Sequence, residues 1–203
     1  MNVKLKGAYV KHLEVELFPG EEFYAEKGSL IYIEEGIDMT SEFSGNSLGQ
    51  IIGSKLSGEN LLIVHYRNFT SQPRRLVLGS RGGMIHFKLT NSEIICNRGA
   101  YVASSKKVDL SMKLSLSGFI GGIGGMLQRV SGDATVFLET IGDPIIVELG
   151  PGQGIQIDEQ HFLALEGIPE NRITPQFSTR NLFGGEGLRM LSVRGPGKVY
   201  LNP

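Results

Sequence analysis

The chain has 203 residues, with 20 Lys and Arg against 21 Asp and Glu, so its formal net charge is -1. This near-neutral balance creates no global field that would concentrate a polyanion or hold the protein on acidic lipid, and it disfavours a dedicated nucleic-acid binder. With 40% hydrophobic and 20% charged residues, the composition excludes a disordered or fibrous protein and is that of a folded domain.

Glycine is over-represented, with 28 copies spread along the chain. Dispersed glycines are typical of many tight turns, which predict many short strands and an all-β fold. The one cysteine, Cys96, excludes an intramolecular disulfide framework, and we interpret it as a core residue in a protein from a reducing compartment. Residues 1–7 lack the apolar core of a secretory signal, and no stretch approaches the roughly 20 apolar residues of a membrane span. We therefore expect a cytoplasmic protein.

In chain order, the first predicted element is a strand at residues 13–17, where Leu and Val alternate with Glu. Such alternation buries one face of a sheet and leaves the other in solvent. Residues 19–31 follow as turn, strand, turn, strand, with Gly20 and Gly28 in the turns. Residues 56–63 then place Gly58 and Glu59 before another apolar strand.

The same order of elements recurs twice downstream. Alternating strands are predicted at 85–89 and 145–149, turn–strand–turn–strand segments at 91–102 and 151–163, and glycine-led strands at 130–137 and 183–190, before a last strand at 195–201. Gly99 falls on the position of Gly28. We therefore divide a single domain into three tandem repeats, residues 1–84, 85–144 and 145–203. Repeats of this size bury little surface alone, so we expect them to stack edge to edge and the two terminal edges to be satisfied by a homo-oligomer, most simply a trimer.

Four stretches carry a resemblance to a known group: residues 26–32, the glycine-rich run 118–129, residues 181–188 and residues 195–201. On these residues the chain resembles the TRAP-like group, named for the tryptophan RNA-binding attenuation protein. Within that group it is similar to relatives of the mitochondrial-biogenesis protein named for altered inheritance of mitochondria. The resemblance implies a short double-stranded β-helix unit, three such repeats per chain and a trimeric ring. It implies no established activity.

The residues favour a protein that is not an enzyme. A metal site in a double-stranded β-helix needs paired histidines with a carboxylate, but the four histidines are isolated: His12, His65, His86 and His161. A Gly-x-Ser-x-Gly nucleophile motif is also missing. The glycine-rich run is not followed by the Lys-Ser/Thr pair of a phosphate-binding loop. We therefore expect no catalytic residue, no metal and no cofactor.

Two groups of residues are candidates for interaction. The first is the apolar set in the glycine-rich run, namely Phe119, Ile120, Ile123, Met126 and Leu127. These side chains either pack against their own or a neighbouring subunit, or form an exposed patch for a protein or membrane-surface partner. The second is a basic set that a ring would multiply into a belt: Arg74, Arg75, Lys106, Lys107 and Arg129.

The leading hypothesis is a non-enzymatic oligomeric scaffold or interaction protein, with a membrane surface as one candidate partner. The alternative is an RNA-binding ring, by analogy with the tryptophan attenuation protein. It is disfavoured because the basic pairs do not recur at equivalent positions of the three repeats. A third alternative is a ligand binder or enzyme that uses a pocket lined by converging polar groups.

Overall fold

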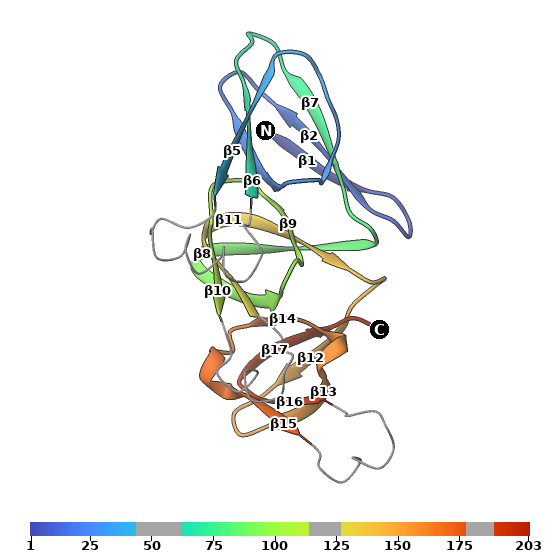
Figure 1. Ribbon diagram of the computed structural model, residues 1–203, viewed down its shortest axis with the longest axis vertical. Coiled ribbons are helices and arrows are strands. Elements are labelled where there is room, and N and C mark those ends of the chain that lie inside the picture. The colour runs from blue at the N-terminus through green and yellow to red at the C-terminus, as the bar shows by residue number, and fades with distance from the viewer. Residues whose placement is uncertain (44–61, 114–126, 178–188) are drawn as a thin grey trace.

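The fold is all-β, as the sequence predicts. The structure, a computed structural model, describes residues 1–43, 62–113, 127–177 and 189–203. Within these ranges the secondary structure consists of β-strands and two short 3-10 helices, arranged in three tiers along the long axis (Figure 1). Among the described residues no helix is both long and apolar enough to cross a membrane.

The first tier is organised around two strands that each pair on both sides. β7 pairs with β2 and β4, so that Leu78 lies opposite both Leu13 and Leu30. β6 pairs with β3 and β5, so that Tyr66 lies opposite both Phe23 and Met39. The strands of this tier are β1 (Asn2–Lys6), β2 (His12–Leu17), β3 (Glu22–Glu26), β4 (Leu30–Ile33), β5 (Ile37–Phe43), β6 (Leu62–Asn68) and β7 (Arg74–Gly79).

The second tier has the same pairing order, but it is built on two long strands. Within it, Leu138 lies opposite both Ile85 and Tyr101, and Val130 lies opposite both Ile94 and Leu110. A register shift between Gly132 and Ala134 separates the two halves of the long pair. The strands are β8 (Gly83–Asn97), β9 (Tyr101–Ser104), β10 (Asp109–Lys113) and β11 (Leu127–Thr140).

The third tier repeats the order with separate strands. Leu201 lies opposite both Ile145 and Phe162, and Val193 lies opposite both Ile155 and Ile173. Its elements are β12 (Ile145–Leu149), β13 (Gly154–Asp158), η2 (Glu159–His161), β14 (Phe162–Glu166), η3 (Glu170–Arg172), β15 (Ile173–Phe177), β16 (Arg189–Arg194) and β17 (Gly197–Leu201).

Neighbouring tiers are joined by one strand pair and a shared core. β3 pairs with β9 between the first and second tiers, and β8 pairs with β14 between the second and third. The core cluster around Phe23 also contains Val102 and Phe137 of the second tier. In the same way, the second cluster contains Leu163 of the third tier. Cys96 is fully buried in that second cluster, as the sequence predicts.

A buried polar side chain closes the first tier. Asn68 is fully buried, and its amide donates to the carbonyl oxygens of Leu17 at 2.8 Å and Gln72 at 2.9 Å. Its side-chain oxygen accepts a hydrogen bond from the backbone N–H of Thr70 at 2.9 Å. Burying a polar group is tolerated here because the group is hydrogen-bonded on both sides.

We predict that Asn68→Leu lowers the free energy of unfolding by about 2–3 kcal/mol, because the buried Leu17 carbonyl and the Thr70 N–H lose a hydrogen-bond partner. Chemical denaturation at a fixed protein concentration measures this loss, with the exposed Asn2→Leu as control. Equal stability of the two variants would show that the Asn68 network contributes nothing.

Candidate functional site

The candidate site is formed by two strands whose outer edges are free in the described part of the chain. β4 ends the four-stranded sheet β1-β2-β7-β4, and β13 ends the three-stranded sheet β13-β16-β15. Their counterparts in the other tiers are not edges. β9 and β14, which occupy the place of β4, each pair with a strand of the preceding tier.

The side chains of β4 are exposed where those of its counterpart in the second tier are buried. Ile31 and Tyr32 are 60% and 48% exposed. The residues at the same positions of the second tier, Val102 and Ala103, are only 4% and 0% exposed because the preceding tier covers them. Exposed apolar side chains on an edge strand are candidates for an interaction surface. β4 therefore lacks the cover that its counterparts have.

Two strand pairs join neighbouring tiers, β3 with β9 and β8 with β14, and we call them the internal joints. They share one register. In the first, Tyr24 lies opposite Ser104 and Ala25 opposite Ala103. In the second, the equivalent residues make the equivalent pairs, Ile95 with Leu165 and Cys96 with Ala164.

If β13 paired with β4 in the same register, Gln156 of β13 would lie opposite Ile33 of β4, and Ile157 would lie opposite Tyr32. A β13–β4 pair cannot form within one chain, because the two strands lie in the two outer tiers (Figure 1). Such a pair would need a second copy of the chain.

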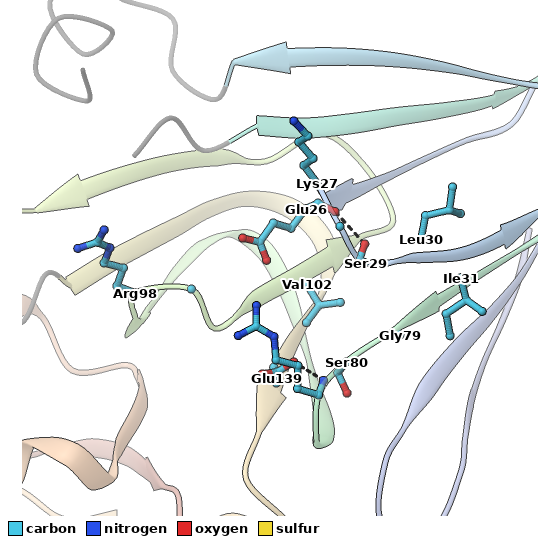
Figure 2. A pocket seen from close by; sticks show the side chains of 13 residues that line it. Glu26, Lys27, Ser29, Leu30, Ile31, Gly79, Ser80, Arg98, Val102 and Glu139 are labelled. Carbon is cyan, nitrogen blue, oxygen red and sulfur yellow. Dashed lines mark hydrogen bonds between the residues drawn. The ribbon is translucent and has the colours of Figure 1, made fainter. Parts of the chain in front are cut away.

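A cavity of about 620 Å³ opens beside the start of β4 (Figure 2). It lies between the first and second tiers, and the turn from β3 to β4 forms one wall. Hydrogen bonds hold that turn: Ser29 Oγ and the Ser29 N–H donate to the Glu26 carbonyl oxygen at 2.8 and 3.2 Å, and the Gly79 N–H donates to the Ser29 carbonyl oxygen at 2.7 Å. The charged residues that line the cavity are Glu26, Lys27, Arg81, Arg98 and Glu139.

Glu26 is the electrostatically distinctive residue of this cavity. Partial burial raises the pKa of its carboxyl group, the positive charge of Arg81 opposes that rise, and the negative charge of Glu139 adds to it. Glu139 itself accepts a hydrogen bond from the backbone N–H of Arg81 at 2.6 Å. The cavity therefore is polar and carries both signs of charge.

The structure describes one residue of the predicted apolar loop. Leu127 begins β11 and packs against the core cluster of the third tier. Phe119, Ile120, Ile123 and Met126 lie outside the described residues.

The predicted basic residues lie on different elements, and most of them have acidic neighbours. Lys106 pairs with Asp133 at 2.7 Å, and Lys107 pairs with Glu42 at 2.6 Å. Arg75 contacts Glu16 at 4.0 Å, and Arg129 contacts Glu93 at 3.3 Å and Glu170 at 3.8 Å. Arg74 and Arg75 begin β7 in the first tier, whereas Arg129 lies on β11 in the second. Acidic neighbours thus offset most of the positive charge that RNA binding requires.

Sequence reasoning missed a polar cluster between β3 and β6. Tyr24 stacks on His65 with ring centroids 4.7 Å apart, and its hydroxyl donates to Glu22 at 3.0 Å. Burial, and then this hydrogen bond, raise the pKa of Tyr24 to about 12. The cluster has no motif because its members come from strands about 40 positions apart. Within the ranges that the structure covers, no three His, Cys, Asp or Glu side chains are placed to hold a metal ion.

Comparison with known proteins identifies the family. The family model for mitochondrial biogenesis AIM24 matches residues 3–203. The chain belongs to the AIM24 family. A relative from Streptococcus pyogenes serotype M6, an uncharacterised protein, is 24% identical over 199 residues, which cover 93% of this chain and 79% of the relative. A crystal structure of a protein from Streptococcus pyogenes has the same fold, with a TM-score of 0.71 at 21% identity over 100% of this chain and 93% of the other.

For this AIM24-family protein we predict that Glu26→Gln raises the melting temperature at pH about 7 and leaves it unchanged at pH about 3. The folded-state pKa of Glu26 lies above its usual value, so the stability that protonation provides is complete below the unfolded-state pKa. It is lost as the pH rises through the folded-state pKa. Thermal unfolding at both pH values measures the difference.

The exposed Glu35→Gln serves as the matched control. If Glu26→Gln destabilises the protein at neutral pH, the Glu26 carboxylate is a favourable partner of Arg81 rather than a strained one.

Proposed function

We propose that this protein is a non-enzymatic scaffold that assembles by joining β13 of one copy to β4 of the next. The observation that carries the proposal is the shared register of the two internal joints, which the free edges of β13 and β4 can reproduce. Unpaired strand edges invite pairing with another chain. A head-to-tail contact of this kind closes into a ring when the rotation allows, and three copies are the proposed number.

In this proposal the three tiers are copies of one six-stranded unit of the TRAP-like, short double-stranded β-helix type. Support comes from the pairing order, which is the same in each tier. In the third tier, β12 and β14 flank β17, while β13 and β15 flank β16. In the first tier, β2 and β4 flank β7, while β3 and β5 flank β6. Further support comes from the core clusters, each of which includes residues of the next tier. A unit that shares its core with a neighbour gains stability from every joint that is filled.

The proposal places the protein in the cytoplasm. Cys96 is a free, fully buried thiol whose pKa burial raises to about 12. A thiol in that state is unreactive and fits a reducing compartment. The apolar residues of the glycine-rich run are the proposed contact for a protein or membrane-surface partner.

The test is a pair of cysteines placed across the proposed joint, Ile33→Cys with Gln156→Cys. Directly opposed residues of antiparallel strands have Cα atoms about 4.5–5.5 Å apart, within the range that a disulfide spans. Mild oxidation of the double variant is expected to give a covalent trimer on a non-reducing gel, and each single variant is expected to run as a monomer.

A matched control is Ile31→Cys with Gln156→Cys, which shifts the register by two residues and is expected to cross-link far less. Failure of the first pair to cross-link, together with a monomeric mass by sedimentation equilibrium, would contradict the proposed assembly.

A further inference from the structure

β2, β8 and β12 occupy the same place in the three tiers, but their outer edges differ in whether another strand pairs with them. In the first tier the edge of β2 is occupied by β1, which pairs antiparallel with it, Val3 opposite Val15 and Leu5 opposite Leu13. In the third tier β12 pairs with β17 and ends its sheet. Among the residues that the structure describes, the edge of β2 is thus occupied and the same edge of β12 is open.

The edge of β12 carries an apolar residue at a position where β2 and β8 each carry a polar one. At the positions of Leu13 and Glu14 in β2, β12 carries Ile145 and Ile146, which are 53% and 55% exposed. Leu13 is fully buried, and Val3 of β1 packs against the same core cluster. The corresponding part of β8 presents His86 and Lys88 to solvent. Charged residues of this kind protect an edge from pairing.

We propose that the β12 edge binds an extended peptide of a different protein by adding it as an antiparallel strand, in the way that β1 is added to β2. This inference rests on the correspondence of the tiers in the proposed function, and it adds a partner-binding edge separate from the β4–β13 joint. Main-chain hydrogen bonds supply affinity in such complexes, and alternate side chains supply specificity.

The pairs between β1 and β2 indicate the chemistry of the peptide. Asn2 of β1 donates to Glu16 at 2.9 Å, and Lys6 pairs with Glu14 at 2.7 Å. β12 retains an acid at the position of Glu16, namely Glu148, but has Ile146 at the position of Glu14. The fitting peptide therefore has a donor or cationic side chain opposite Glu148, and apolar side chains opposite Ile146 and at the positions of Val3 and Leu5.

Charge complementarity argues against a second β12 as the occupant. In an antiparallel pair of two β12 strands centred on Val147, Glu148 of each copy would face Ile146 of the other. That arrangement offers neither carboxylate a donor from the opposite strand. Glu148 instead contacts Lys198 of β17 at 3.5 Å in the present structure and can accept a further donor.

The probe is a synthetic peptide with the sequence of residues 1–7 in which Lys4 is replaced by Val, so that an apolar residue faces Ile146. The full-length protein is incubated with the peptide, and amide hydrogen exchange is followed by mass spectrometry. Protection is expected in residues 145–149, with no change in β2, whose edge β1 already occupies. Ile146→Lys is expected to weaken binding about tenfold.

Ile141→Lys is the matched control, because Ile141 is an exposed isoleucine in the turn before β12. It is expected to leave peptide binding unchanged. The proposal is overturned if the peptide protects no residue of β12 at millimolar concentration, or if both lysine variants bind the peptide equally. It is also overturned if Ile146→Lys lowers the sedimenting mass, because a second copy would then cover the edge. Cross-linking of the Ile33→Cys, Gln156→Cys pair in the Ile146→Lys background separates failure of this edge from failure of the assembly.

Discussion

The hydrogen-bonding demand of strand edges governs how this molecule is put together. Every backbone N–H and C=O on a strand needs a partner, and a strand at the end of a sheet leaves one row of them to water or to another chain. Between the tiers that demand is met by β3 with β9 and by β8 with β14. In the described part of the chain the outer edges of β4 and β13 have no such strand partner, and the proposed assembly follows from that difference.

Core packing also couples neighbouring tiers. Phe137 of β11 contacts Phe23 of β3 with ring centroids 6.3 Å apart, so the first core is completed by a residue of the second tier. Phe87 and Tyr200 make an edge contact at 4.9 Å between the second and third tiers. Because apolar side chains gain stability from being removed from water, a tier without a neighbour would expose part of its core. Ile31 and Tyr32 are in that situation on β4.

The sequence predicts the strands of this fold well because their signals are local. Alternation identified residues 13–17, 85–89 and 145–149 as strands, and all three lie in β2, β8 and β12. Burial of Cys96 could also be predicted, because it lies in a continuous apolar stretch. The added strand β1 was missed although Val3 and Leu5 alternate with polar residues, because the segment is short and depends on pairing with β2.

The candidate sites were less predictable because they depend on contacts between distant segments. The charged cavity brings together the ends of β3, β7, β8 and β11, and no motif in the sequence links them. The ion pairs that offset Lys106, Lys107 and Arg129 likewise involve residues on other elements. Composition shows that the charges balance, but only the fold shows which charges meet.

The most direct measurement of the central claim is the amide hydrogen exchange of β4 and β13 in the intact protein as its concentration is varied. If copies join through these edges, the amides of residues 30–33 and 154–158 are protected at high concentration as strongly as those of β3 and β9. They lose that protection on dilution. Fast exchange of β4 and β13 at every concentration, beside full protection of β3 and β9, would contradict the account.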